Sequence, residues 1–168
     1  PVMTTTTAPR VLHADEGETV RLFDLGVRFL IEGDTTTGAF SLVEHPLPPR
    51  ALGSPLHTHR NEDEYSYVLE GRVGVLIGDD VVVAGPGELV FKPRAVPHAF
   101  WNSGDEPARL LEMISPAGFE NYFREMAPVL DGPEPDFAAA AKVADRYGID
   151  LDFGSVPMLV ERFGLRMG

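Results

Sequence analysis

Two histidines and a group of acids lie within one short segment of the chain, LHTHRNEDEYSYVLEG (residues 56–71). His57 and His59 are separated by one residue, so on an extended strand both imidazoles leave the same face and can converge on one point. Three carboxylates follow directly, those of Glu62, Asp63 and Glu64, and any of them could add an oxygen donor. This segment therefore predicts a large part of a metal site built from nitrogen and oxygen ligands.

A third histidine, His98, begins another apolar run, HAFWN, directly after Pro97. Three histidines at the starts of strands, two of them followed by acids, favour a metal site over isolated structural histidines. His13 lies in a polar N-terminal stretch and His45 just before PLPP. Neither has a partner at ligand spacing, so we expect no metal role for these two.

The chain contains no cysteine, which excludes disulfides, thiolate metal sites and cysteine nucleophiles. Imidazole and carboxylate donors suit Ni, Fe, Mn, Co, Cu or Zn, and the donor types alone do not separate these ions. The sequence also lacks the G-x-S-x-G and G-x-x-x-x-G-K-[ST] motifs, which gives no support to a serine hydrolase or a phosphate-binding loop.

The elements that must position these ligands are short and rich in Val, Leu, Phe and Tyr. From residue 19 to residue 115, runs such as YSYVLE, RVGVLIG and HAFWN alternate with Gly, Pro, Asp or Asn about every ten residues. This pattern is typical of an all-β sandwich or barrel. The length of 168 residues fits one compact domain.

After residue 115 the apolar period changes to that of helices. Phe119, Tyr122, Phe123 and Met126 form one stripe, with Ser115 as the expected cap and Pro128 as the expected end. This stripe either closes one mouth of the barrel or packs on its outer surface. Further helices are expected at about 135–147 and 156–163. We therefore divide the chain into a loose N-terminal arm (1–18), a β-barrel (19–115) and a helical C-terminal extension packed outside the barrel (116–168).

The motifs carry a family resemblance. The pattern His57-x-His59-x4-Glu64, with Gly71 beyond it, resembles the first cupin motif, and Gly87-x5-Pro93 with His98-x3-Asn102 resembles the second. The resemblance implies a double-stranded β-helix, the cupin jelly-roll barrel, with the metal held by His57, His59, Glu64 and His98. Two turn glycines of the family are replaced, by Ala51 and Ala95, so we expect those turns to be rebuilt.

Strand alternation from these ligands predicts the walls of a substrate pocket. Counting from Glu64 it places Ser66 and Val68 inward, and counting from His98 it places Phe100 and Asn102 inward. Mainly apolar walls favour a small, partly aromatic substrate.

Among cupins, the segments HTHRNEDEYSYVLEG, FKPRAVPHAFWN and DRYGID resemble bacterial quercetin 2,3-dioxygenase-like proteins. The resemblance implies a dioxygenase that cleaves a flavonol or a similar aromatic or enol substrate, with Glu64 as both ligand and proton acceptor. An apolar cavity is expected to raise the pKa of that carboxyl. A metal-dependent isomerase or decarboxylase, or a small-molecule binding or sensing cupin without catalysis, are the alternatives.

The net charge and the exposed edge strands limit the kinds of partner that we expect for this chain. The formal net charge of −12 disfavours nucleic acid and anionic membranes. The N-terminal residues lack the pattern of a secretory signal, and no segment has the length of a membrane span, so we expect a cytoplasmic protein. The run VVVAG is apolar on both faces, which favours a homodimer.

Overall fold

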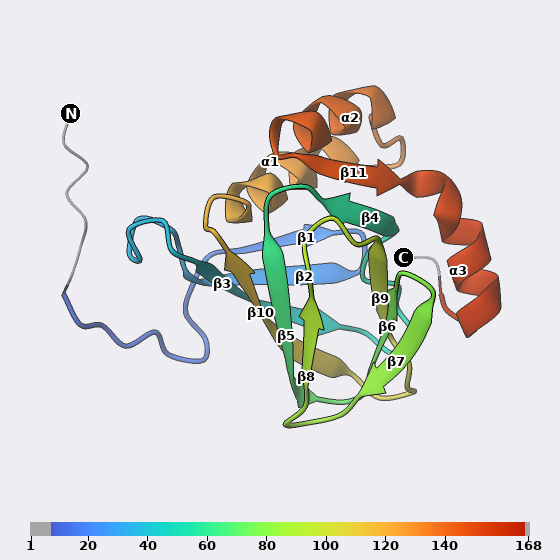
Figure 1. The fold of residues 1–168 in the computed structure, drawn as a ribbon, viewed down its shortest axis with the longest axis horizontal. Helices are drawn as coiled ribbons and strands as arrows, with labels where there is room; N and C mark the ends of the chain where they lie inside the picture. The colour runs from blue at the N-terminus through green and yellow to red at the C-terminus, as the bar shows by residue number, and fades with distance from the viewer. Residues whose placement is uncertain (1–7, 167–168) are drawn as a thin grey trace.

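Two antiparallel sheets form the body of the protein in the computed structural model, which describes residues 8–166 (Figure 1). The first sheet has six strands, in the order β1 (Thr19–Leu22), β2 (Leu25–Ile31), β3 (Ser41–Leu47), β10 (Ala108–Ser115), β5 (Asp63–Glu70) and β8 (Leu89–Lys92). The second has five, in the order β11 (Ile149–Asp152), β4 (Leu56–His59), β9 (His98–Asn102), β6 (Val73–Ile77) and β7 (Asp80–Ala84). The predicted all-β architecture is confirmed.

The core lies between the sheets because alternate side chains of each strand point inward. On β5 the inward positions are Glu64, Ser66 and Val68, and on β10 they include Leu110 and Glu112. Val68 and Leu110 are completely buried. Alternation thus also carries polar and charged side chains into the interior at positions 64, 66 and 112.

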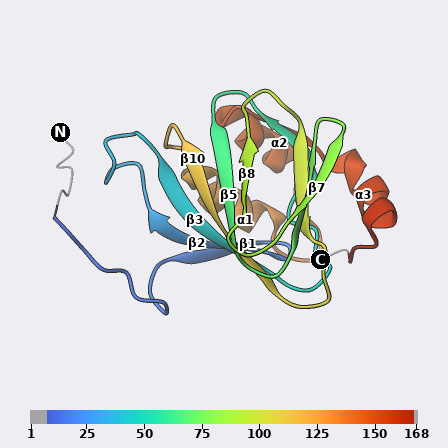
Figure 2. The ribbon, with the colours of Figure 1, turned by 60° about the horizontal axis from the view of Figure 1, so that its bottom comes forward.

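Three helices follow the barrel strands, namely α1 (Glu120–Leu130), α2 (Phe137–Arg146) and α3 (Val156–Phe163), with a single 3₁₀ turn, η1 (Phe153–Ser155), before the last. Figure 1 shows α1 and α2 together beside β11, and both Figure 1 and Figure 2 show α3 apart from them on the side of the five-stranded sheet. The outward-facing Trp101 of β9 stacks on Phe163 with ring centroids 3.9 Å apart. The helix α3 therefore packs outside the barrel, as expected.

The first helix differs from its prediction at both ends. Ser115 does not cap it, because this residue is still part of β10 and its hydroxyl donates to the carbonyl of Ala39. The helix begins at Glu120, whose carboxylate accepts from the amides of Gly33 and Gly118. Pro128 does not end it, since the helix runs on to Leu130. A proline in the last turn removes one backbone hydrogen bond, but burial of the Leu130 side chain holds the end of the helix in place.

The C-terminal extension also contains a strand that helical periodicity did not predict. Residues Ile149–Asp152 form β11, which pairs antiparallel with β4 and places Leu151 opposite His57. The extension thus shares a sheet with the strand that carries two of the candidate ligands. No helix among residues 8–166 is long and apolar enough to cross a membrane.

The N-terminal arm is described only from residue 8, so residues 1–7 of the expected loose arm lie outside the described residues. Residues 8–18 form neither helix nor strand. They nevertheless contact the barrel, because the guanidinium of Arg28 on β2 donates to the carbonyl of Glu16 at 3.0 Å.

The two turns in which alanine replaces a family glycine have different outcomes. Ala95 adopts a left-handed conformation, with φ of 64°, and its amide donates to the carbonyl of His59 at 2.7 Å. This turn is kept rather than rebuilt, at the energetic cost of a Cβ in that conformation. Near Ala51 the left-handed residue is Arg50, with φ of 58°, so Ala51 itself does not adopt the conformation that favours glycine.

Candidate metal centre

The three histidines come from neighbouring strands of one sheet. His57 and His59 lie two residues apart on β4, so both point into the barrel, and His98 on β9 is the direct cross-strand partner of His57. The ring centroids of His57 and His98 are 4.3 Å apart. All three side chains are buried.

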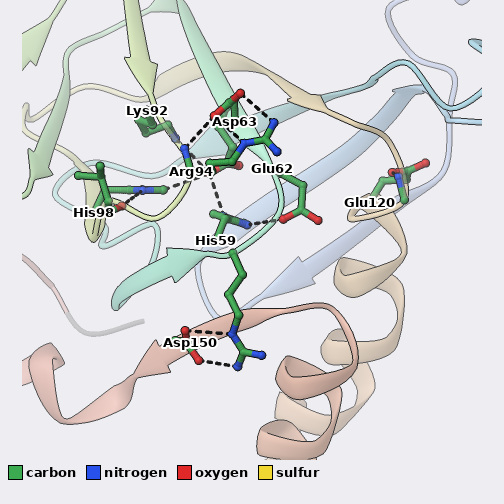
Figure 3. A network of polar contacts seen from close by, with 12 residues as sticks. His59, Glu62, Asp63, Lys92, Arg94, His98, Glu120 and Asp150 are labelled. Carbon is green, nitrogen blue, oxygen red and sulfur yellow. Dashed lines mark hydrogen bonds and ion pairs between the residues drawn. The ribbon is translucent and has the colours of Figure 1, made fainter.

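Glu64 completes the cluster from the opposite sheet. Its Oε1 lies 2.9 Å from Nε2 of His59 and 3.0 Å from Nε2 of His98 (His59 and His98 are labelled in Figure 3). One potential ligand atom from each of His57, His59, Glu64 and His98 lies within 4.8 Å of the others. The structure therefore brings together all four residues that the sequence motifs singled out.

Hydrogen bonds to the outer ring nitrogens orient two of the imidazoles. Nδ1 of His57 lies 2.8 Å from the carbonyl of Pro55, and Nδ1 of His98 lies 3.3 Å from the carbonyl of Val96. A carbonyl can only accept, so the contact of His57 places a proton on Nδ1 and leaves its Nε2 lone pair free. Nε2 of His98 lies within hydrogen-bond distance of Glu64, so an ion bound there would move the proton of His98 to Nδ1, which faces the carbonyl of Val96. This is the tautomer that a metal ligand needs.

Beside His59, the carboxylate of Glu62 takes the place that backbone carbonyls take beside His57 and His98. Its Oε2 lies 3.5 Å from Nδ1 of His59, and both atoms are buried without a hydrogen-bond partner within the described part of the chain (Figure 3). Sequence reasoning did not distinguish Glu62 from a solvated loop acid, but its side chain is buried and faces His59. Asp63, in contrast, points outward and pairs with Arg94 at 3.0 Å.

The protonation states differ within the cluster. Burial lowers the pKa of His57 well below its ordinary value and also lowers the pKa of His98. Burial acts in the same direction on His59, but the carboxylates of Glu64 and Glu62 outweigh it and raise the pKa of His59 to about 9. In the protein alone, His59 therefore carries the proton that an ion would displace.

The pKa of Glu64 is not raised, contrary to the expectation from an apolar cavity. Burial alone would raise it, but the charges of His59 and Lys92 and the hydrogen bonds from His59 and His98 bring it well below its ordinary value. Glu64 is consequently ionised and ready to act as a ligand.

A buried ion pair lies next to Glu64. Nζ of Lys92 is 2.7 Å from Oε1 of Glu112 and 3.9 Å from Oε1 of Glu64. Oε2 of Glu112 accepts a short hydrogen bond from the hydroxyl of Ser66. Burial raises the pKa of Glu112 to about 7, although Lys92 and Ser66 act in the opposite direction.

These observations fit a divalent ion. The cluster offers three imidazole nitrogens and one carboxylate oxygen, in a buried site whose outer hydrogen bonds already orient the rings. The two unpartnered atoms of His59 and Glu62 would form a hydrogen bond once His59 is held as a neutral ligand with its proton on Nδ1. The His/Glu cluster is therefore able to bind a metal ion, and its donors do not determine which one.

An aromatic cavity of about 70 Å³ adjoins the cluster. Its lining includes His57, His59 and Glu64 together with Phe119, Tyr122 and Phe123 of the segment that leads into and forms α1. The ring of Phe119 meets that of His59 edge-on, with centroids 4.5 Å apart. Of the two expectations for the apolar stripe, the structure thus shows the one in which α1 closes an end of the barrel.

The predicted pocket residues are divided between the cavity and the deeper interior. Phe100 lines the cavity, whereas Ser66, Val68 and Asn102 are not among its lining residues. Ser66 donates to Glu112, and Val68 is buried in the core. The amide of Asn102 donates to the carbonyls of Leu47, Pro48 and Glu106, which fixes loops near the far end of β9.

Three residues at the cavity were missed by sequence reasoning. Lys92 and Glu112 share a strand face with buried apolar residues, so alternation in ELVFKP and RLLEMI was the available signal. His45, for which we expected no metal role, is outside the cluster but lines the cavity. Burial lowers its pKa to about 4, and its Nδ1 lies 2.9 Å from the carbonyl of Gly26.

Comparisons with known proteins agree with this geometry. Residues 44–114, which carry all four clustered residues, match the model of the cupin domain family. An uncharacterized protein of Methanocaldococcus jannaschii is 25% identical over 85 residues, which cover 51% of this chain and 68% of the relative.

Several solved structures share the fold. KdgF from Halomonas sp. is 16% identical, with a TM-score of 0.59, and the alignment covers 68% of this chain and 99% of KdgF. A predicted oxalate decarboxylase from Thermotoga maritima is 21% identical, with a TM-score of 0.58 and coverage of 63% and 98%. A sugar phosphate isomerase of the cupin superfamily from Silicibacter pomeroyi is 23% identical, with a TM-score of 0.55 and coverage of 63% and 75%. The chain therefore has a cupin fold with a buried His-His-Glu-His cluster.

Proposed function

We propose that the protein is a metal-dependent enzyme that cleaves a small aromatic or enol substrate with dioxygen. The observation that carries the proposal is the buried cluster of three histidines and Glu64 at the wall of an aromatic cavity. Three imidazoles and one carboxylate leave coordination positions free on a first-row ion, which suits direct binding of a substrate oxygen. The ion would be one of Ni, Fe, Mn, Co, Cu and Zn.

In this proposal the chain's residues position the substrate and move one proton. An ion held by His57, His59, Glu64 and His98 would supply Lewis acidity toward the substrate oxygen. Glu64 would accept the hydroxyl proton of the bound substrate at a carboxylate oxygen. The rings of Phe119 and Tyr122, which stack with centroids 4.7 Å apart, would exclude water from the reacting atoms.

Oxygen consumption tests the reaction. The protein would be reconstituted separately with iron, nickel, manganese and cobalt and supplied with quercetin, the flavonol that the sequence resemblance points to. We expect metal-dependent oxygen uptake with release of carbon monoxide. If these metals bind but none of them supports oxygen uptake, the dioxygenase assignment is contradicted, whereas the assignment of the metal centre is not.

A second reaction class is favoured by the pair of Lys92 and Glu112. A carboxyl with a pKa of about 7 beside the cluster can donate or accept a proton near neutral pH, as isomerisation or decarboxylation without oxygen requires. The structural neighbours include proteins described as an isomerase and a predicted decarboxylase. In this case Glu112→Gln would abolish turnover while leaving the bound metal in place.

We also propose that the chain forms a homodimer. Val81, Val82 and Val83 on the edge strand β7 are each at least 40% exposed. Exposed apolar edge strands are sites of association with another chain. Light scattering should give a dimer mass for the native chain and a monomer mass for the double variant Val81→Lys, Val83→Lys.

A further inference from the structure

A second cavity of about 330 Å³ lies directly outside the cavity at the metal centre. The two share six lining residues, which are Leu22, Phe23, Gly53, Ser54, Pro55 and Phe153. The inner space of about 70 Å³ has room for only a few non-hydrogen atoms. Together the two spaces have the size of a small-molecule site.

The C-terminal extension contributes five of the eleven residues that line the outer cavity. Its remaining lining residues come from the α1–α2 connection, the first residue of α2 and the start of α3, together with Leu52. Phe137 and Phe153 meet edge-on, with ring centroids 5.1 Å apart. Of this set, only Leu52, Gly53, Ser54 and Pro55 lie within the segment that matches the cupin family, and the other seven lining residues lie outside it.

The outer cavity is apolar and open to solvent. Phe23 is 43% exposed and Phe137 is 52% exposed, although burial of aromatic rings is favourable. Phe23 also has a left-handed backbone conformation, with φ of 52°, which is unusual for a bulky residue. The turn between β1 and β2 thus places this ring at the cavity rather than in the core.

One residue shared by the walls of the two cavities carries a polar atom without a partner. Oγ of Ser54 is buried and has no hydrogen-bond partner within residues 8–166. Ser54 lines both cavities. Buried hydroxyls are normally paired, so this one is available to a ligand that passes from one space to the other.

We infer that the two cavities form one binding site for an elongated amphipathic molecule. Its small oxygen-bearing head lies in the inner cavity at the cluster, and its apolar body lies in the outer cavity against Phe23, Phe137 and Phe153. A polar atom of the ligand, between its head and its apolar body, forms a hydrogen bond with Oγ of Ser54. The placement of the head rests on the proposed metal-dependent function, whereas the binding of the apolar body does not.

A homologous series of alkyl hydroxamates tests the site, with affinities measured by titration calorimetry on both the metal-free and the metal-loaded protein. Each methylene that enters the outer cavity should raise the affinity about fourfold. Octanohydroxamate has four more methylenes than butanohydroxamate, and we expect it to bind roughly 250-fold more tightly in both forms. The ratio between the two compounds is informative even if no metal binds, so the inference and the proposed metal centre can fail separately.

Two phenylalanines with matched exposure provide the variant and its control. Phe137→Ser removes a wall of the outer cavity, and Phe91→Ser removes a ring of similar exposure from the outer face of β8. Phe137→Ser should weaken octanohydroxamate binding about tenfold and leave butanohydroxamate unchanged. Phe91→Ser should change neither affinity. Absence of a chain-length effect in the native protein, or equal effects of the two variants, would overturn the inference.

Discussion

Nζ of Lys92 lies 2.7 Å from Oε1 of Glu112, and each side chain is only 1% exposed. The pair joins β8 and β10 inside the barrel, next to the ligand Glu64. Charge placed this deep is stable only while its partner is present.

Removal of one partner should therefore be much more costly than removal of both. We expect Lys92→Met to lower the free energy of unfolding by about 3–5 kcal/mol, because it leaves Glu112 buried without its cation. The double variant Lys92→Met, Glu112→Leu should recover most of that loss. Urea denaturation of the native protein and the variants measures the difference. A double variant as unstable as Lys92→Met would show that the pair is not the source of the effect.

Metal binding should release about one proton per ion at pH 7.5. His59 has a pKa of about 9 and is protonated, whereas lowered pKa values keep His57 and His98 neutral and Glu64 ionised. Only His59 must therefore lose a proton to become a ligand. Calorimetry in buffers of different ionisation enthalpy counts the protons, and the count should fall toward zero as the pH rises through 9.

The variant Glu62→Gln is the control for this proton count. Glu62 helps to raise the pKa of His59, so its removal should reduce the release at pH 7.5. In the metal-free protein, the raised pKa of His59 contributes stability that is fully present below about pH 6.5 and is lost as the pH rises through about 9. No proton release at pH 7.5, despite metal binding, would mean that His59 is already neutral.

The turn after Pro93 offers a stabilising substitution. Ala95 has a φ of 64°, and glycine adopts this conformation without the clash of a Cβ. We expect Ala95→Gly to raise the free energy of unfolding by about 1 kcal/mol, with metal affinity unchanged because the backbone N–H of residue 95 still donates to the carbonyl of His59. Ala99→Gly, in the buried strand β9, should be destabilising by comparison. Thermal unfolding of both variants measures the change in stability, which should be positive for Ala95→Gly and negative for Ala99→Gly.

The sequence predicted the ligands better than the cavity, and the reason is geometric. The resemblance to the cupin motifs singled out His57, His59, Glu64 and His98, and strand alternation places His57 and His59 on one face. A cavity wall also depends on depth along the barrel, which alternation does not give. Val68 and Asn102 have the predicted inward direction, but they lie deeper, where neighbouring core side chains and loop carbonyls fill the space.

Sequence reasoning also did not predict how the C-terminal extension contributes to the cavity and to the five-stranded sheet. Helical periodicity found the apolar stripe from Phe119 to Met126 but did not determine which surface it covers. The strand β11 is only four residues long, and its residues IDLD alternate too briefly to distinguish a strand from a loop. Its pairing with β4 depends on contacts between segments far apart in the sequence.

Metal stoichiometry tests the central claim most directly. Equilibrium dialysis against nickel, followed by elemental analysis, should give one ion per chain for the native protein. His98→Ala should lower the affinity at least about 100-fold, since it removes a ligand. His45→Gln, which changes a buried histidine at the same cavity but outside the cluster, should bind one ion as the native protein does. Equal binding by the native protein and His98→Ala, or no binding by the native protein, would contradict a metal centre formed by His57, His59, Glu64 and His98.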